Sequence, residues 1–290
     1  MKLGYLYNQV IRLGRDRDPR KKSVISSYAD TAILYGDRHT EVKKVLIGID
    51  IEVAELLLAD RIRQTQGLDL VIAHHPEGKA YAALHEVMCL QVELLRQAGV
   101  SAKVARELVE ERQLEVARRI LPQNHLRAVD AARLLDLPFI CVHTPADNHV
   151  SSFIKALLDK EKPRQVQDIV DILNQIPEYQ EAARISVGPR IILGNPRRSV
   201  GKILMEMTGG TEGPKDAFDK LYKAGVRTLV SMHLSDEHFK KVKDTNLNVV
   251  IAGHISSDTL GLNLLLDRIE QTAKEKLEVI SCSGFKRIRR

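Results

Sequence analysis

The segment "VKKVLIGIDIEVAELLLADRIRQTQGLDLVIAHH" (residues 42–75) places two apolar runs of strand length on either side of a helix-length stretch. We expect strands over 42–51 and 68–75 and a helix over 53–65. Near-continuous apolar strands that alternate with helices are typical of sheets covered by helices on both faces. The segment therefore predicts an α/β fold.

The same alternation continues along the rest of the 290 residues. Further strands are expected over 138–143, 190–194, 227–233, 248–254 and 276–284, and helical segments over 79–121 with a break at Gly99, 125–136, 150–160, 166–176, 216–225, 235–243 and 257–275. Charge and proline in "DKEKPRQ" and "NQIPEYQ" place the domain boundary between residues 160 and 190. We therefore expect two related α/β halves, residues 1–160 and 161–290.

Composition excludes several classes of protein. The chain is 44% apolar, enough for a sizeable core, and with 4% aromatic residues and no Trp this core should be mainly aliphatic. No run of 18 apolar residues predicts a membrane span, and the start "MKLGYLYNQVIRLGRDRD" lacks the features of a signal peptide. The three cysteines, Cys89, Cys141 and Cys282, form no CxxC pair, and their odd number argues against a disulfide framework. A cytoplasmic protein without membrane attachment is the expectation.

The net charge of +6 is concentrated in three basic stretches, 12–22, 195–202 and 285–290. They are read as solvated termini and loops, with a phosphate-bearing partner as the alternative. No helix-turn-helix, RNP-like or zinc-finger pattern is present, so nucleic-acid binding is not expected. The stretch "GNPRRSVGK" lacks the spacing of a P-loop, and Ile203 occupies the position that requires Ser or Thr.

Four predicted strands end on histidine: "LDLVIAHH", "PFICVH", "RTLVSMH" and "NVVIAGH". They carry five of the ten histidines, His74, His75, His143, His233 and His254. In open α/β sheets, ligand sites form at the carboxyl ends of the strands. The repeated pattern therefore predicts that these side chains converge on a ligand site.

Carboxylates follow two of these histidines at the same spacing. Asp147 lies four residues after His143, and Asp258 lies four residues after His254. Histidine with carboxylate is the ligand mixture of zinc, manganese, iron, cobalt or nickel, whereas calcium prefers oxygen ligands alone. For Asp258, at the start of a predicted helix, helix capping is the alternative explanation.

Taken in order, "TAILYGD", "VKKVLIGIDI", "LDLVIAHHP", "VHTPAD" and "NVVIAGHISSD" resemble the Nif-three-like family, also known under the name GTP cyclohydrolase 1 type 2. The resemblance runs from about residue 29 to residue 285. It implies two intertwined α/β halves with mixed sheets covered by helices, and a homo-oligomer built as a hexameric ring. It also implies a dinuclear centre that holds two divalent transition-metal ions per chain.

The ligands of that centre follow from the resemblance residue by residue. His74 and His75 match the paired histidines of the family, and His254 matches the histidine of its "GH" motif. Asp147 matches an aspartate that bridges the two ions. Asp258 stands where the family usually has glutamate, one methylene longer.

Other departures concern the surroundings of the centre. "HHPEGKAY" replaces the family's "HHPLIF", and the stretch from His75 to Asp147 is longer than in the family, with a helical pattern in the excess. His143 is the first candidate for an outer-shell or proton-transfer role, followed by His233 or His238. The alternative for each is a hydrogen-bonded histidine at a strand end.

Two functions remain open from the sequence. The first is a metal-dependent hydrolase whose dinuclear centre acts on an anionic, nucleotide-like or phosphorylated small molecule. The second is a metal-binding interaction or regulatory protein without turnover. Ring opening of GTP enters only through the resemblance.

Overall fold

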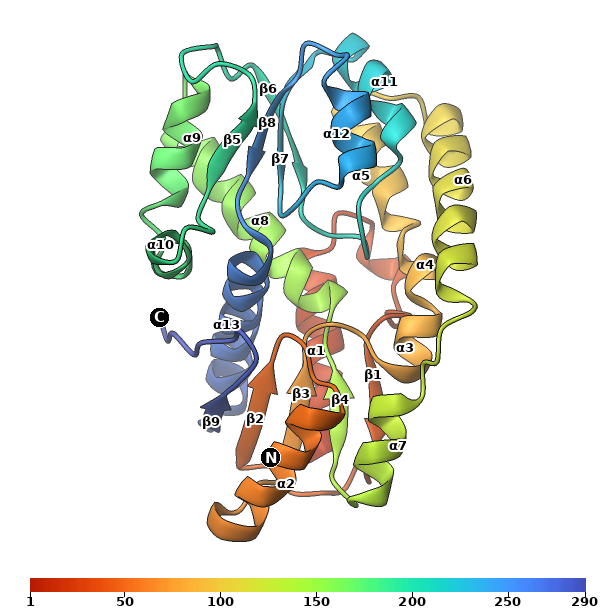
Figure 1. The fold of residues 1–290 in the computed structure, drawn as a ribbon, viewed down its shortest axis with the longest axis vertical. Helices are drawn as coiled ribbons and strands as arrows, with labels where there is room; N and C mark the ends of the chain where they lie inside the picture. The colour runs from red at the N-terminus through yellow and green to blue at the C-terminus, as the bar shows by residue number, and fades with distance from the viewer. The chain divides into compact units, whose positions relative to one another are not determined.

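A computed structural model of residues 1–290 contains two mixed sheets covered by helices, so the predicted α/β class is confirmed (Figure 1). The strands are β1 (Ala32–Tyr35), β2 (Lys44–Gly48), β3 (Leu70–Ala73), β4 (Phe139–Cys141), β5 (Arg190–Leu193), β6 (Lys202–Glu206), β7 (Val226–Ser231), β8 (Asn248–Ile251) and β9 (Glu278–Ser281). The α-helices are α1 (Leu3–Arg17), α2 (Val53–Gln66), α3 (Gly78–Ala82), α4 (Leu84–Val87), α5 (Leu90–Ala98), α6 (Ala102–Ile120), α7 (Arg127–Leu134), α8 (Thr144–Glu161), α9 (Val166–Leu173), α10 (Pro177–Arg184), α11 (Phe218–Lys223), α12 (Asp236–Val242) and α13 (His254–Ala273). None of these helices combines the length and apolar composition that a membrane span requires.

The chain divides into two compact units, and each draws on separated stretches of sequence. The first contains Met1–Val87, Val116–His149 and Asp258–Arg290, and the second contains Met88–Glu115 and Val150–Ser257. These bounds differ from the expected halves 1–160 and 161–290. Three of the boundaries between the units fall inside helices, one each in α6, α8 and α13.

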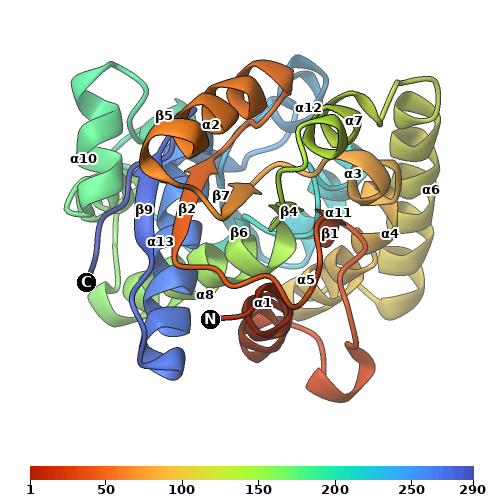
Figure 2. The ribbon, with the colours of Figure 1, turned by 90° about the horizontal axis from the view of Figure 1, so that it is seen from below.

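The sheet of the first unit has the order β1-β4-β3-β2-β9, with β1 antiparallel and the other strands parallel. Figure 2 shows α2 and α7 on one side of this sheet and α1 and α13 on the other. Side chains alternate across the sheet: Val45 and Ile47 of β2 belong to the cluster with α1 and α13, whereas Leu46 belongs to the cluster with α2 and α7. Both faces are therefore apolar, which explains the near-continuous apolar strands in the sequence.

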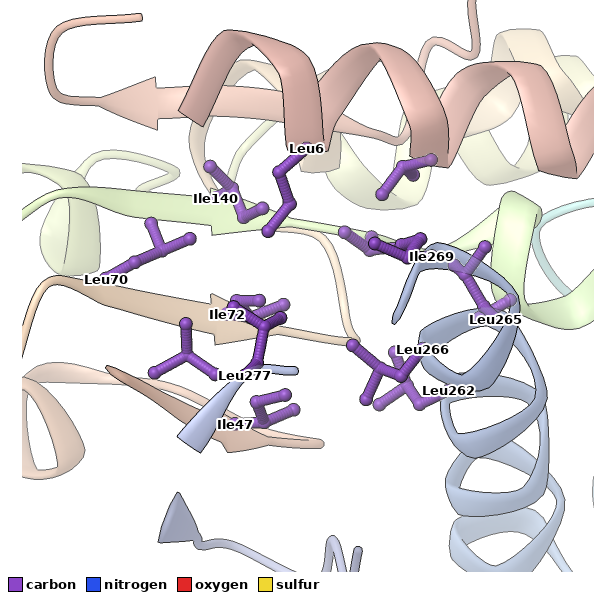
Figure 3. Close-up of a cluster of buried hydrophobic side chains, with 14 of the residues drawn as sticks. Leu6, Ile47, Leu70, Ile72, Ile140, Leu262, Leu265, Leu266, Ile269 and Leu277 are labelled. Carbon is purple, nitrogen blue, oxygen red and sulfur yellow. The ribbon is translucent and has the colours of Figure 1, made fainter. Parts of the chain in front are cut away.

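The core under α1 and α13 is almost entirely aliphatic, as the composition predicts. Figure 3 shows Leu6 together with Ile47, Leu70, Ile72, Ile140 and the α13 side chains Leu262, Leu265, Leu266 and Ile269. Full burial of one such side chain contributes about 1.5–3 kcal/mol. This packing fixes α13, and with it Asp258 in the part of α13 that belongs to the first unit.

The second unit repeats the strand order of the first. Its sheet has the order β5-β8-β7-β6, in which β5 is antiparallel and the other three strands are parallel. Each antiparallel edge strand carries a register irregularity, between Ile33 and Tyr35 in β1 and between Ile191 and Leu193 in β5. A glycine with positive φ follows each of these two edge strands, Gly36 after β1 and Gly194 after β5. The two units are thus built on the same four-stranded plan.

Two helices begin earlier than the sequence indicates. The helix expected over 150–160 begins at Thr144, and the helix expected over 257–275 begins at His254. Asp147 therefore lies in the first turn of α8, and His254 is the first residue of α13. The expected break at Gly99 is confirmed: this residue ends α5 in a left-handed conformation.

The basic C-terminal stretch is held by carboxylates within the first unit. The side chain of Arg287 is almost fully buried, and its guanidinium lies 2.6 Å from a carboxylate oxygen of Asp267 and 3.1 Å from one of Glu270. Arg289 adds a second contact to Glu270 at 3.3 Å. These residues are therefore largely neutralised by α13, which argues against the C-terminal stretch as a free phosphate-binding patch.

Gly14 is a position where α1 cannot accept a side chain. A Cβ placed there would lie 2.7 Å from the Cβ of Pro145 in the first turn of α8. We expect Gly14→Val to lower the free energy of unfolding by about 1–3 kcal/mol because α8 must move. Arg12→Val, at an exposed position of the same helix, should lower it by only about 0.5 kcal/mol. Urea unfolding measures both, and equal losses would contradict the close approach of the helices.

Candidate metal centre

The adjacent parallel strands β3 and β4 end at the same edge of the first sheet. Ala73 pairs with Cys141, so His74 follows one strand directly and His143 follows the other after one further residue. The ring centroids of His74 and His143 are 5.0 Å apart, and those of His74 and His75 are 5.3 Å apart. The two strand ends therefore bring three of the predicted histidines together.

All three histidines are held through Nδ1 by an oxygen atom. In His74 the partner is the carbonyl oxygen of Val142 at 3.0 Å. In His75 it is a carboxylate oxygen of Asp50 at 2.6 Å, and in His143 it is a carboxylate oxygen of Asp30 at 2.8 Å. Because these oxygens are acceptors, Nδ1 carries the hydrogen and Nε2 is left as the atom that can bind a metal.

The two predicted aspartates lie between these Nε2 atoms. Asp258 approaches His74 through Oδ1 and His75 through Oδ2, each at 3.4 Å. Asp147 approaches His74 through Oδ1 at 3.4 Å and His143 through Oδ2 at 3.8 Å. Each carboxylate thus faces two different imidazoles, which is the arrangement a bridging carboxylate needs. The shorter side chain of Asp258, compared with glutamate, still reaches both histidines.

Burial tests whether these residues fit a metal. His74, Asp147 and Asp258 are at most 5% exposed. Nε2 of His74 and Oδ1 of Asp147 are buried without a hydrogen-bond partner, although such atoms normally have one. The ligand atoms of His74, Asp147 and Asp258 lie within 4.8 Å of one another, and so do those of His74, His75 and His143. The donor set, imidazole with carboxylate, fits a divalent transition metal.

Comparison with solved structures supports the family suggested by the motifs. A NIF3 superfamily protein from Sphaerobacter thermophilus matches with a TM-score of 0.80 and 29% identity, over 96% of this chain and 98% of that chain. The chain is NIF3-like in its fold. Reduced HcgD from Methanocaldococcus jannaschii matches at TM-score 0.57 and 15% identity, over 97% of each chain. A Bacillus cereus protein related to NIF3 matches at 0.50 and 10%, over 95% and 96%. No family model and no curated protein matches.

Electrostatics in this NIF3-like protein favour protonated histidines when no cation is bound. Burial alone would lower the pKa of His74, but Asp258 and Asp147 outweigh it and raise the pKa to about 10. Burial likewise opposes protonation of His75, yet Asp258 and Asp50 raise its pKa to about 9. Positive charge close to these carboxylates is therefore favoured, and either protons on the histidines or a metal ion can provide it.

The other two histidine-bearing strand ends belong to the second unit, where β7 and β8 are also adjacent and parallel. The ring centroids of His233 and His254 are 4.6 Å apart. Nδ1 of His233, whose side chain is 42% exposed, lies 3.5 Å from Oε1 of Glu212. His254 lies one turn before Asp258 on the same face of α13.

His238 is almost fully buried and has both ring nitrogens engaged. Nε2 lies 2.8 Å from the carbonyl oxygen of Gly213, and Nδ1 lies 2.8 Å from Oγ of Ser235. Burial lowers the pKa of His238 despite the carbonyl of Gly213 and the nearby carboxylate of Glu212. A proton-transfer role for His238 stays a prediction.

Sequence reasoning missed three carboxylates that orient histidines: Asp30, Asp50 and Glu212. Asp50 could have been found, because it lies two residues after β2, beside the strand that carries His75. Asp30 precedes a short edge strand, and Glu212 lies in a glycine-rich loop, so neither position carried a signal. The stretch 194–202 leads into strand β6 instead of the helix that a P-loop requires.

The raised pKa values predict how the metal-free NIF3-like protein responds to pH. Protonated His74 and His75 stabilise the fold fully below the unfolded-state pKa of about 6.5. That contribution is lost as pH rises toward the folded-state values of about 9 and 10. Urea unfolding of chelator-treated protein should therefore show stability falling from pH 6.5 to pH 10, with a flatter profile for His74→Gln. Equal pH profiles for wild type and His74→Gln would contradict the raised pKa of His74.

Proposed function

We propose that the chain is a metal-dependent hydrolase with a dinuclear centre of two divalent transition-metal ions. The observation that carries the proposal is the alternation of imidazole and carboxylate, in which Asp147 and Asp258 each face two histidines. The proposed ligands are His74, His75, Asp147, His254 and Asp258. Zinc, manganese, iron, cobalt and nickel all accept this donor set.

The chemistry of such a centre is hydrolytic. When bound there, two such ions would lower the pKa of a water molecule and polarise a phosphoryl or carbonyl oxygen. The chain contributes the orientation of the ligands, because Asp50 and Val142 fix the rings of His75 and His74. It also keeps His74, Asp147 and Asp258 away from bulk water, which strengthens electrostatic interactions at the site.

His254 enters the proposal through its place on α13. It precedes Asp258 by four residues, so both side chains leave the same face of one continuous helix. His233 is the proposed proton-transfer residue of this segment. Its ring lies beside that of His254, its side chain is partly exposed, and Glu212 orients the ring through Nδ1.

Glu212 is suited to hold His233 because it stays ionised. Burial raises the pKa of this carboxyl, but His233, His238 and the backbone amide of Ser235 lower it to about 2. A carboxylate in this state is a strong acceptor for Nδ1–H of the imidazole. The pair therefore has the form of an oriented general acid or base.

The proposed substrate is an anionic, nucleotide-like or phosphorylated small molecule. Four positive charges on two ions would meet Asp147 and Asp258, with Asp30 and Asp50 one layer further out. Because these charges nearly cancel, the attraction of an anion would depend more on open coordination positions at the ions than on a long-range electrostatic field. GTP belongs in the screen because the family resemblance names it. The resemblance also leads us to propose a homo-oligomer, a hexameric ring.

Asp147→Ala tests the dinuclear proposal. Loss of a carboxylate that faces both His74 and His143 should lower the metal content from about two ions per chain, and hydrolysis should fall by at least about 100-fold. Asp159→Ala, at an exposed position of the same helix, should change neither. Mass spectrometry of metals and a nucleotide and phosphatase screen provide the readouts. Normal metal content with Asp147→Ala would end the dinuclear assignment.

The same experiment separates the two candidate functions. If wild-type protein retains two ions yet hydrolyses none of the nucleotides and phosphate esters, the second function, a metal-binding interaction or regulatory protein, replaces the first.

His254→Ala should also lower the metal content, because the proposal counts His254 among the ligands. Ile255→Ala is the matched control: it is the next residue of the same helix turn and is 38% exposed. Both variants are compared with wild type by metal analysis after gel filtration. Full metal content in His254→Ala would remove His254 from the ligand set and leave the four ligands of the first unit.

A further inference from the structure

We propose that His143 is itself a metal ligand, bound to the same ion as Oδ2 of Asp147. This inference rests on the proposed function and deepens it, because the sequence assigns His143 only an outer-shell or proton-transfer role. Its Nε2 is the atom that Oδ2 of Asp147 approaches, at 3.8 Å, while Oδ1 faces His74. If Asp147 bridges two ions, the ion on its Oδ2 side lies next to His143.

The position of the Nδ1 hydrogen supports a ligand role. Metal-binding histidines generally donate the second ring N–H to a carboxylate or a carbonyl oxygen. His143 does so to Asp30, as His75 does to Asp50 and His74 to the carbonyl of Val142. His143 thus has the same device as the two histidines already assigned as ligands.

Asp30 is built to hold His143 in place. It is fully buried, and its Oδ2 also accepts hydrogen bonds from Oγ1 of Thr144 at 2.6 Å and from the amide of Thr144 at 3.3 Å. Thr31 fixes the backbone of His143, whose amide donates to Oγ1 of Thr31 at 3.1 Å. Hydrogen bonds to the ring and to the backbone amide of His143 therefore fix its position together.

Proximity to the other ligands completes the argument. The ligand atoms of His74, His75 and His143 all lie within 4.8 Å of one another. Two nitrogens bound to one tetrahedral ion at about 2.1 Å would be about 3.4 Å apart, and nitrogens on neighbouring ions can be further apart, so this spacing suits a centre with two ions. The ring of His143 lies 5.0 Å from that of His74 and 6.0 Å from that of His75, measured between centroids.

The shared strand plan of the two sheets provides a parallel with the proposed ligands His254 and Asp258. In each unit, a strand next to the antiparallel edge strand leads into a long helix, β4 into α8 and β8 into α13. A histidine at the start of that helix is followed by aspartate four residues later in both, His143 with Asp147 and His254 with Asp258. His143 is the residue before α8 and His254 the first residue of α13, so both pairs lie on one face of a first turn.

Cobalt binding to the full chain tests the inference. Chelator-stripped protein is titrated with Co²⁺, the visible absorption bands are recorded, and affinity is measured by competition with a chromophoric chelator. We expect His143→Ala to change the cobalt spectrum and to weaken one of two sites by at least about 100-fold. Asp30→Asn, which keeps His143 but removes its carboxylate partner, should weaken the same site by about 10–100-fold.

His149→Ala is the matched control. His149 is also buried, lies on α8 and has Nδ1 bound to a carbonyl oxygen, that of Pro145 at 2.8 Å, but it belongs to no group of ligand atoms. Its cobalt spectrum and affinities should equal those of wild type. His143→Gln, which keeps a polar side chain of similar volume, replaces His143→Ala if circular dichroism shows that the alanine variant is unfolded.

Two different failures are distinguishable. A wild-type protein that binds two cobalt ions, with a His143 variant of unchanged spectrum and affinities within about threefold, overturns the ligand role of His143 and leaves the proposed function intact. A wild-type protein that binds no cobalt overturns both.

Discussion

Parallel pairing of β3 with β4 positions the candidate centre of the first unit. It aligns Ala73 with Cys141, and the histidines that follow leave the same sheet edge. Helix α8 then begins at once, which places Asp147 in its first turn, and the packing of α13 against the apolar face of the sheet places Asp258. Candidate ligands that are far apart in sequence thus depend on one strand register, because a slip by one residue would turn each strand-end side chain to the opposite face.

Hydrogen-bond acceptors behind the three histidines orient their imidazole rings. Asp30, Asp50 and the carbonyl of Val142 each take the Nδ1 hydrogen of one imidazole, so three Nε2 atoms face the two inner carboxylates. The inner carboxylates are buried, and they hold protons on His74 and His75 over a wide range of pH. A metal that binds here would have to displace these protons, so its affinity should rise as the histidines lose them.

The sequence predicted the elements with strong apolar patterns and missed those without. The strands around Leu46, Val71 and Ile140 and the break at Gly99 were recognised because burial on two faces and a left-handed residue leave clear signals. Helix α1 was missed because its basic residues were read as a charged terminus, and β1, β6 and α10 are short or lie next to polar loops. Periodicity alone carries little information for such elements.

For the candidate site, the sequence singled out the strand-end histidines, but it did not show which of them lie on adjacent strands. The four strand ends divide into one adjacent pair in each sheet, β3 with β4 and β7 with β8. That division follows from the strand order, which no local pattern encodes. The orienting carboxylates Asp30 and Glu212 were invisible for a related reason, since their partners are distant in sequence.

The place of β9 has a consequence for how the chain reaches this structure. β2 pairs on one side with β3, about 25 residues later in sequence, and on the other side with β9, near the C-terminus, where Lys44 is opposite Glu278. Contacts of such long range are slow to form because the intervening chain must first be ordered. One edge of β2 therefore stays open until β9 pairs with it, and Asp258 lies in α13, the helix directly before β9.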